Sequence, residues 1–296
     1  MDINGYTRLA AVVANPIKHS LSPFIHNRAF ELTAENGVYV AWELNEDDPT
    51  DKKDTALAQA LVNIRLLNMY GVNLSMPYKQ LAMWYVNDLS ESAKLIGAIN
   101  TIVNDHGQLI GHNTDGTGFW RAAEESNFYV AGQEIVILGG GGAAIAIVAE
   151  AALRGAGAIH VYARRSASFE PLAEKLAKLQ ELTHVTISLT DIADERQLQK
   201  TLLTARFLAN ATSVGMDGLG SPVSESLTIH PETLVMDVIY KVEKTPFLSW
   251  AESQGAKTAN GVGMLLYQAA AAFKLWTGKD MPTKQIEREL REKLHG

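Results

Sequence analysis

Short apolar runs alternate with segments of helical spacing along most of the chain, an order typical of α/β proteins. The runs that predict buried strands cover residues 9–14, 38–44, 71–75, 135–138, 159–162, 185–188, 207–210 and 234–238. Helical spacing covers residues 23–32, 56–66, 117–126, 263–276 and 283–294. Segments 99–103 and 109–111 flank a turn sequence and predict a hairpin. Pro77 suits the first turn of a helix. Beyond Gly255 the pattern is helical.

The chain of 296 residues is long enough for two domains, each with its own core. The predicted strands form two alternating groups, one before residue 115 and one after the helix 117–126. We therefore expect a substrate-binding domain made of residues 1–115 and 260–296 and a nucleotide-binding domain made of residues 116–259. The amphipathic stretch after residue 263 is expected to return to the first domain, which makes that domain discontinuous. Substrates and cofactors commonly meet in a cleft between such domains.

The apolar run 135–138 ends abruptly in four glycines, 139–142, and an alanine-rich helical segment follows. This order of strand, glycine turn and helix is that of a dinucleotide-binding βα unit. Glycine permits a positive φ and lets a pyrophosphate approach the backbone, and the N–H groups of the following helix favour the anion. The spacing departs from G-x-G-x-x-G, so a plain tight turn is the alternative.

The next predicted strand, 159–162, ends where such a unit selects between NAD and NADP. An NAD-binding unit places a carboxylate there, whereas this chain continues Ala163-Arg164-Arg165-Ser166 and has no acidic residue before Glu170. A guanidinium can bind a 2′-phosphate through two hydrogen bonds and stack on adenine. The pattern predicts NADP, with NAD as the alternative cofactor. Two arginines that merely solvate a strand end would give the same pattern.

Composition limits the class of protein further. Hydrophobic residues make up 47% and charged residues 20%, which is typical of a folded globular protein. The net charge of −7 disfavours binding to nucleic acid, and no apolar run is long enough to span a membrane. The chain has no cysteine, and its histidines at 19, 26 and 112 match no zinc spacing, so no metal is expected. The N-terminal residues lack the regions of a signal peptide, which favours the cytoplasm.

Segments spread over almost the whole chain resemble those of the shikimate dehydrogenases, including the similar quinate/shikimate dehydrogenases. These segments are 15–23, 73–79, 97–101, 113–116, 139–144, 210–213, 240–246 and 261–268. The resemblance implies a discontinuous α/β substrate domain and a Rossmann-type domain with a parallel sheet. It also implies reversible, NADP-linked oxidation of the C3 hydroxyl of shikimate to 3-dehydroshikimate. In the biosynthesis of aromatic amino acids this reaction runs towards ketone reduction.

The resemblance also implies a role for particular residues. Lys79 and Asp115 would be the catalytic pair, with the C3 oxygen between them. The substrate hydroxyls and carboxylate would be held by Ser20, Ser22, Ser75, Asn100, Tyr240 and Gln268. The cofactor would lie against Gly139, Gly140, Gly141, Gly142, Ala143, Ala163, Arg164, Arg165, Thr212, Ser213, Gly261 and Met264.

The residue types suit this chemistry. Shikimate carries three hydroxyls and a carboxylate, so its site needs closely spaced donors and acceptors, which hydroxyls and amides supply. Hydride transfer to a ketone builds negative charge on oxygen, and Lys79 can supply the proton while Asp115 orients it. The pair titrates as a unit, so the sequence does not assign the proton to one member. Taken singly, Ser20 and Ser22 also suit a turn and helix cap, Lys79 a surface charge and Asp115 an Asx turn.

Departures from the commonest family pattern leave alternatives open. Ser75 replaces a frequent threonine, Gly140 a frequent alanine and Ala163 a frequent asparagine, while Arg165 is similar to the quinate/shikimate branch. Oxidation of quinate, with NAD or with both cofactors, is therefore one alternative. A non-catalytic NADP-binding redox sensor is another, although it predicts loss of the catalytic pair, which is present. The sequence does not distinguish a monomer from a homodimer.

Overall fold

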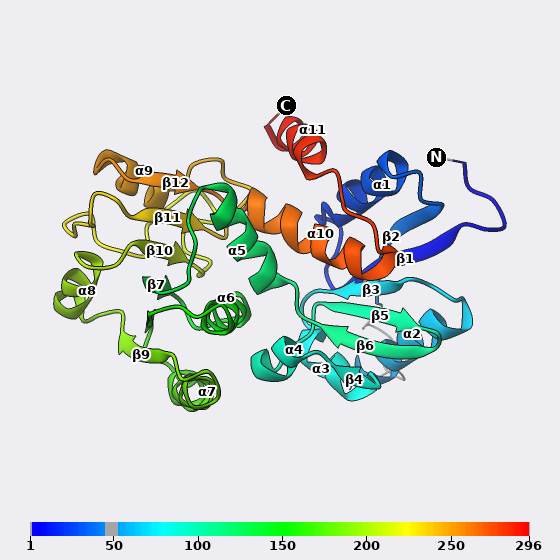
Figure 1. The fold of residues 1–296 in the computed structure, drawn as a ribbon, viewed down its shortest axis with the longest axis horizontal. Helices are drawn as coiled ribbons and strands as arrows, with labels where there is room; N and C mark the ends of the chain where they lie inside the picture. The colour runs from blue at the N-terminus through cyan, green and yellow to red at the C-terminus, as the bar shows by residue number, and fades with distance from the viewer. Residues whose placement is uncertain (1, 45–52, 296) are drawn as a thin grey trace. The chain divides into compact units, whose positions relative to one another are not determined.

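The computed structural model describes residues 2–44 and 53–295 of the chain (Figure 1). The chain divides into two compact units. Unit 1 comprises residues 1–114 and 268–293, and unit 2 comprises residues 115–267 and 294–296. The division falls inside helix α10 (Val262–Thr277), so unit 1 is discontinuous in sequence.

Unit 1 is built on a mixed sheet whose strand order, within the described residues, is β2-β1-β3-β5-β6-β4. Strands β1, β2 and β3 are parallel, β5 and β6 form an antiparallel hairpin beside β3, and β4 runs parallel to β6. The strands are β1 (Arg8–Ala14), β2 (Gly37–Glu43), β3 (Gly71–Leu74), β4 (Asp88–Leu89), β5 (Thr101–Asp105) and β6 (Gln108–His112). The helices are α1 (Ser22–Leu32), α2 (Lys53–Leu66), α3 (Tyr78–Leu81), the 3-10 helix η1 (Ala82–Tyr85), α4 (Glu91–Ile96) and most of α11 (Thr283–His295).

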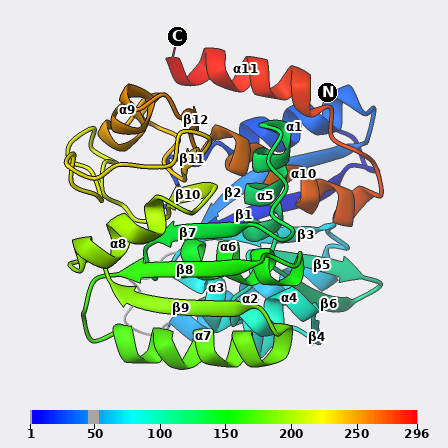
Figure 2. The ribbon, with the colours of Figure 1, turned by 60° about the vertical axis from the view of Figure 1, so that its left-hand side comes forward.

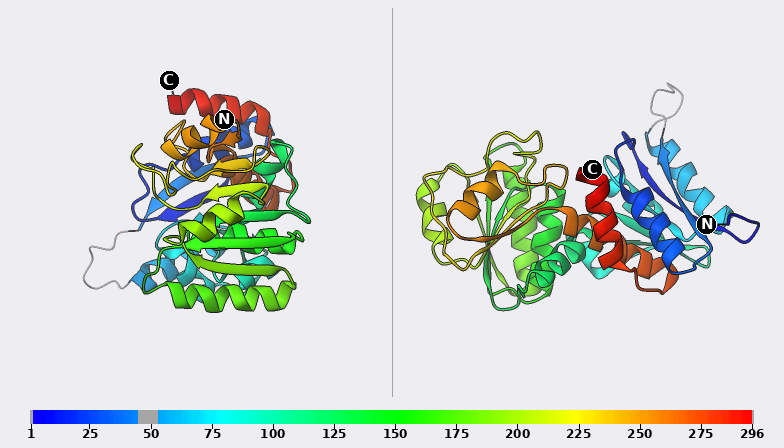
Figure 3. Two further views of the ribbon diagram at one scale, coloured as in Figure 1. Left: turned by 90° about the vertical axis from the view of Figure 1, so that its left-hand side faces the viewer. Right: turned by 90° about the horizontal axis from the view of Figure 1, so that it is seen from above.

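Helices cover both faces of the unit 1 sheet (Figure 3). On one face, apolar side chains of α2 form a core with alternate residues of β1 and β3. On the other face, Phe30 of α1 packs edge-on against Phe273 of α10 at 5.2 Å between ring centroids. Trp276 of α10 donates a hydrogen bond from Nε1 to the Ile102 carbonyl at 3.0 Å. Because both faces are buried, β1 is apolar at successive positions and shows no alternation.

His26 of α1 is fully buried on the face covered by α10. Its ring stacks on Tyr39 with centroids 4.3 Å apart and packs against Trp276 at 5.2 Å. Neither ring nitrogen has a hydrogen-bond partner among the described residues. Burial lowers the pKa of His26 to about 3, and the neighbouring Asn73 offsets this effect only in part. The ring is therefore neutral in the folded protein at any pH near neutrality.

We expect the free energy of unfolding to fall as the pH drops from 6.5, the ordinary pKa of histidine, towards 3. In this window the unfolded chain binds a proton at His26 that the folded chain does not, which costs about 1.4 kcal/mol of stability per pH unit. Urea unfolding of wild type and His26→Leu at about pH 7.5 and about pH 5 measures this contribution. The substituted protein should lose less stability on acidification. An equal loss in both proteins would contradict the assignment.

Unit 2 is built on a parallel sheet whose order, in the part of the chain that is described, is β9-β8-β7-β10-β11-β12 (Figure 2). Counted from β7 as the first strand, this order is 3-2-1-4-5-6, the Rossmann arrangement. The strands are β7 (Glu134–Leu138), β8 (Ala158–Ala163), β9 (Thr186–Asp191), β10 (Phe207–Asn210), β11 (Leu234–Asp237) and β12 (Lys257–Ala259). The helices are α5 (Asp115–Glu125), α6 (Gly142–Leu153), α7 (Phe169–Thr183), α8 (Glu195–Leu202) and α9 (Pro246–Ser253). The predicted fold class is confirmed.

The sequence missed or misplaced five short features. Strand β12 lies beyond Gly255, where only helices were expected, because it is a three-residue edge strand without an apolar run. Strand β9 extends to Asp191, past the predicted end at 188. Strand β4 and helix α4 are too short to show a period. Pro77 is the N-cap residue of α3 and does not lie in its first turn.

Helix α5 begins at Asp115 and approaches α6 closely within unit 2. The next residue, Gly116, makes this approach feasible, because a Cβ there would lie 2.3 Å from the carbonyl oxygen of Ala146. Asp115 therefore starts a packed helix, and the glycine after it serves helix packing. The alternative prediction, an Asx turn at Asp115, is therefore wrong, because Asp115 is the first residue of a helix.

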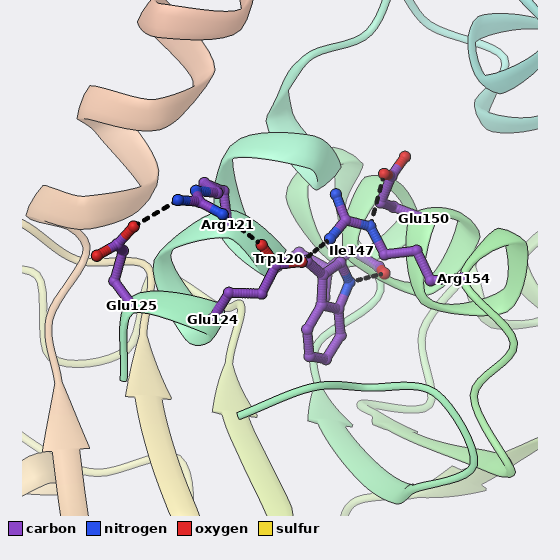
Figure 4. Close-up of polar contacts among 7 residues, drawn as sticks. All are labelled: Trp120, Arg121, Glu124, Glu125, Ile147, Glu150 and Arg154. Atoms are coloured by element: carbon purple, nitrogen blue, oxygen red, sulfur yellow. Dashed lines mark hydrogen bonds and ion pairs between the residues drawn. The ribbon is translucent and has the colours of Figure 1, made fainter. Parts of the chain in front are cut away.

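Polar contacts hold the other end of α5 against α6 (Figure 4). Trp120 donates from Nε1 to the Ile147 carbonyl at 2.9 Å. Arg154 at the end of α6 binds Glu124 of α5 at 2.6 Å and Glu150 of its own helix at 2.9 Å. A buried indole hydrogen bond and partly buried ion pairs resist sliding of one helix along the other. The starts of both helices, Asp115 and the glycine turn, are consequently fixed relative to each other.

Candidate functional site

A cavity of about 580 Å³ lies in unit 2, between loops that follow β7, β8 and β10. Strands β7 and β10 are neighbours in the sheet, and the strand order reverses between them. Ligands of open parallel sheets bind at such a switch point. The predicted cofactor residues that line the cavity are Gly139, Gly140, Gly141, Ala163, Arg164, Thr212 and Ser213. Those that do not line it are Gly142, Ala143, Arg165, Gly261 and Met264.

In the glycine turn, Gly139 lies close to the backbone of the loop after β10, whereas Gly141 and Gly142 face open space. Gly139 has a φ of +117°, and a Cβ there would lie 2.9 Å from the Ala211 carbonyl oxygen. At Gly141 and Gly142 a Cβ would meet no atom within 4 Å. Gly141 is the N-cap of α6 and offers no side chain to its first turn. The N–H groups and the positive dipole end of α6 therefore remain for an anion, which is more than a plain turn requires.

The end of β8 brings one arginine of the predicted pair to the cavity. Arg164 and Ser166 line it, and none of the described lining residues is acidic. Arg165 lies outside the lining, with its guanidinium 5.3 Å from the Phe169 ring and 4.0 Å from a Glu170 oxygen. The cavity therefore offers a guanidinium and a hydroxyl, and no carboxylate, where a ribose 2′-phosphate would lie.

The opposite wall is the loop 211–214 after β10, and Asn210 holds its shape. The fully buried Asn210 side chain accepts from the Thr212 N–H at 3.0 Å and from its hydroxyl at 2.7 Å. The Asn210 amide nitrogen donates to the Val214 carbonyl at 3.1 Å. Asn210 received no role from the sequence, although a polar residue at the end of an apolar strand was the available signal.

Gly261 and Met264 lie at the start of α10, away from the cavity lining. Gly261 is buried, and a Cβ there would lie 2.1 Å from the Val238 carbonyl oxygen. Close approach of two backbone segments therefore explains why this position is glycine. Contact of either residue with the cofactor stays a prediction. Tyr240 lies on the adjoining segment, where burial raises the pKa of its phenol.

Five of the six predicted substrate residues lie in unit 1, and three of these follow the parallel strands β1 and β3. Ser20 and Ser22 follow β1, and Ser75 follows β3 directly. Backbone hydrogen bonds join the two strand ends, since the Ser75 N–H donates to the Val13 carbonyl at 3.0 Å. Gln268 belongs to the part of α10 counted in unit 1. Parallel strands bring their carboxyl ends to one edge, which is why serines distant in sequence come from the same end of the sheet.

The two serines before Pro23 form a turn without a side-chain cap. Helix α1 begins at Ser22, its N-cap is Leu21, and this N-cap residue makes no side-chain cap hydrogen bond. The Ser20 hydroxyl oxygen accepts from the Ser22 N–H at 3.3 Å. The alternative of a turn is thus borne out for Ser20, while the N-cap position itself is taken by Leu21 and by neither serine. Substrate binding by the two hydroxyls stays a prediction.

Asn100 is the centre of a buried polar cluster at this edge. Its amide nitrogen donates to the Thr114 hydroxyl at 2.9 Å, and its amide oxygen accepts from the Thr114 N–H at 2.8 Å and the Thr101 hydroxyl at 3.0 Å. Asn73 donates to the Asn100 carbonyl at 3.2 Å and accepts from the Tyr39 hydroxyl at 2.7 Å. These partners lock the Asn100 side chain in one orientation. The sequence missed their supporting role, for which polar residues inside buried strands were the signal.

The two predicted catalytic residues are each tied through the backbone to the Asn100 cluster. Lys79 is half-buried in α3, and its carbonyl oxygen accepts from the Ile99 N–H at 2.8 Å. Asp115 follows Thr114 directly and is counted in unit 2. Pairing of the two side chains stays a prediction. Within residues 2–44 and 53–295, no group of three His, Cys, Asp or Glu residues is arranged to hold a metal ion, and no helix is long and apolar enough to cross a membrane.

Comparisons with known proteins extend these observations. Residues 12–102 match the family described as "Shikimate dehydrogenase substrate binding domain", and residues 261–291 match "Shikimate 5'-dehydrogenase C-terminal domain". The chain is 56% identical over 294 residues to the shikimate dehydrogenase (NADP(+)) of Lactococcus lactis subsp. cremoris strain MG1363, covering 99% of this chain and 100% of that protein.

Two solved structures share the fold over nearly the whole chain. The shikimate 5-dehydrogenase of Listeria monocytogenes, in complex with shikimate and NAD, has a TM-score of 0.90 at 41% identity and covers 98% of both chains. The shikimate 5-dehydrogenase of Thermus thermophilus, in complex with NADP(H) and shikimate, has a TM-score of 0.79 at 31% identity, covering 96% of this chain and 99% of that chain.

The strand order of unit 2 and the cavity at its switch point define a Rossmann-type, dinucleotide-dependent oxidoreductase. Sequence identity over the full chain narrows this class. The chain belongs to the shikimate dehydrogenase family, as its motifs predicted.

Proposed function

We propose that the protein catalyses the reversible, NADP-linked oxidation of shikimate to 3-dehydroshikimate, in the direction of ketone reduction during aromatic amino-acid biosynthesis. The observation that carries this proposal is the unit 2 cavity, which combines an open glycine turn with Arg164 and has no acidic residue among its described lining. Relatives named shikimate dehydrogenase (NADP(+)) that match over 99% of the chain support the same substrate and cofactor.

Each unit has its own part in the proposed reaction. The domain formed by residues 1–115 and 260–296 binds shikimate, and the domain formed by residues 116–259 binds NADP. The polar cluster around Asn100 supports the first assignment, because a polyol needs oriented donors and acceptors. The glycine turn at the start of α6 supports the second. The substrate contacts are Ser20, Ser22, Ser75, Asn100, Tyr240 and Gln268.

Lys79 and Asp115 carry out the proton transfer in this proposal. Bound NADPH supplies the hydride for C3 of the ketone. The Lys79 ammonium gives its proton to the C3 oxygen as negative charge develops there, and it takes the proton back in the oxidative direction. Asp115 holds the ammonium in place and accepts a hydrogen bond from the substrate hydroxyl.

A second candidate is use of NAD, or of quinate, by the same site. The Listeria monocytogenes relative was crystallised with NAD, and this chain has Ala163 and Ser166 around its cavity arginine. Quinate carries a C1 hydroxyl in place of the ring alkene, so few contacts separate the two substrates. Discrimination between them rests on one or two contacts near the carboxylate, and serine at positions 20 and 22 does not exclude quinate.

Steady-state rates with shikimate and with quinate, each with NADP and with NAD, test the proposal. We expect kcat/KM to be highest for shikimate with NADP, by about tenfold or more over shikimate with NAD or quinate with NADP. The two cofactors differ by two charge-assisted contacts to the 2′-phosphate, and the two substrates differ by one buried hydroxyl contact. A higher kcat/KM with NAD or quinate would support the second candidate. Absence of turnover with intact NADPH binding would instead support a redox-sensing protein.

A further inference from the structure

Asp237 is a fully buried carboxylate that lies outside the cavity lining. It ends β11, and Asn210 is its register partner at the end of β10. The Asp237 carboxylate accepts three hydrogen bonds, from the Asn210 amide nitrogen at 3.1 Å, the Ile239 N–H at 3.0 Å and the Thr245 hydroxyl at 2.7 Å. Burial raises the pKa of Asp237, and the three donors partly offset this effect.

The Asn210 amide connects Asp237 to the cavity wall. Its nitrogen donates to Asp237 and to the Val214 carbonyl, and its oxygen accepts both Thr212 donors. A carboxylate has acceptors only, so Asp237 fixes which way the amide is turned. The reversed amide would present N–H groups to the Thr212 N–H, leaving buried donors opposed. The Asn210 orientation that shapes loop 211–214 is therefore stabilised by a buried acidic side chain that does not line the cavity, in addition to the loop's own backbone groups.

We propose that Asp237 is a positioning residue for the dinucleotide: acting through Asn210, its carboxylate holds loop 211–214 in the conformation that lines the cavity. This inference rests on the proposed function, because it takes the cavity as the NADP site. It adds a residue that neither the motifs nor the cavity lining indicates. The same carboxylate also accepts a hydrogen bond from the Ile239 N–H, next to Tyr240. One buried side chain therefore orders both the loop after β10 and the segment after β11.

Dissociation constants for NADPH, measured by fluorescence titration of the full-length protein, test the inference. Asp237→Asn keeps the shape but removes the acceptor-only partner, and it should weaken NADPH binding about fivefold. Asn210→Ala should weaken it about tenfold. The double variant should bind like Asn210→Ala alone, because Asp237 acts through Asn210. At saturating cofactor, kcat should stay within about twofold of wild type, so the change appears in KM for NADP.

Thr233→Val is the matched control. Thr233 is buried just before the opposite end of β11 and donates to the Ala205 carbonyl at 3.0 Å, so the variant loses a buried hydrogen bond of the same sheet. It should lower the melting temperature and leave NADPH affinity unchanged. If Asp237→Asn does not fold, two other variants are measured in its place: Asn210→Asp and the exchanged pair Asn210→Asp/Asp237→Asn. The exchanged pair should bind NADPH more tightly than Asn210→Asp alone.

Four results would overturn the inference, and the first three are wild-type affinity in Asp237→Asn, full additivity with Asn210→Ala, and no recovery in the exchanged pair. An equal loss of affinity in Thr233→Val would do the same, since it would show a general effect of stability. The proposed function fails differently, because the wild-type protein would then either not bind NADPH or bind it without turning over shikimate.

Discussion

Lys79→Ala is expected to lower kcat by about 10²- to 10⁴-fold, the usual contribution of a positioned general acid. The C3 oxygen would then develop charge with no proton donor at hand, while the cofactor cavity in unit 2 stays intact. NADPH affinity should therefore stay near wild type, and KM for shikimate should change much less than kcat. Initial rates in both directions, together with a fluorescence titration of NADPH, measure these quantities.

Lys94→Ala is the matched control for this prediction. Lys94 is another lysine of unit 1, exposed and paired with Asp88 at 3.1 Å on the surface. Loss of an exposed ion pair costs little stability, so its kcat should stay within about twofold of wild type. A Lys79→Ala enzyme with wild-type kcat would remove Lys79 from the mechanism, and an equal loss in both variants would point to a general effect of charge.

Arg164→Ala is expected to raise KM and the dissociation constant for NADP roughly 10- to 100-fold, because each charge-assisted hydrogen bond to a phosphate contributes about 1.5–3 kcal/mol. The corresponding values for NAD should change by less than about threefold, since NAD has no 2′-phosphate for the guanidinium to bind. The ratio of kcat/KM for the two cofactors is the measurement. Equal losses with NADP and NAD would contradict the 2′-phosphate assignment.

Arg165→Ala separates the two neighbouring arginines. Arg165 is exposed, lies outside the cavity lining and contacts Phe169 and Glu170. Its removal should change KM for NADP by less than about threefold, because its guanidinium lies outside the cavity lining, beside the exposed Glu170. If Arg165→Ala weakened NADP as much as Arg164→Ala, both guanidinium groups would have to reach the phosphate.

The local sequence pattern was sufficient to predict the strands that bury a continuous run of apolar side chains. The strands β1, β7 and β10 are apolar at most successive positions because both of their faces are buried. The glycine turn was equally visible, because only glycine tolerates the backbone of Gly139 and the close approach of Ala211. Strand β12 escaped detection, since an edge strand of three partly exposed residues has no such pattern.

The supporting residues of the site could not be predicted in this way. Asn73 and Asn210 are single polar residues of buried strands. Asn73 bonds to Tyr39 on β2, which β1 separates from β3, and to the backbone carbonyl just before β5, whereas Asn210 bonds to Asp237 on the adjacent strand β11. A sequence shows that such a residue needs a partner but not which one, because strand order and register decide the partner. The glycine at 116 is similar, since only the packing of α5 on α6 explains it.

By itself, the sequence determined the α/β class, the dinucleotide turn and the family, because these depend on periodicity and on short motifs that report local backbone needs. Only the tertiary structure decided that Arg164 and not Arg165 lines the cavity, and that Asp237 lies behind the loop that completes it. Those outcomes depend on which strands become neighbours, and the free energy that selects them comes from burial summed over the whole sheet.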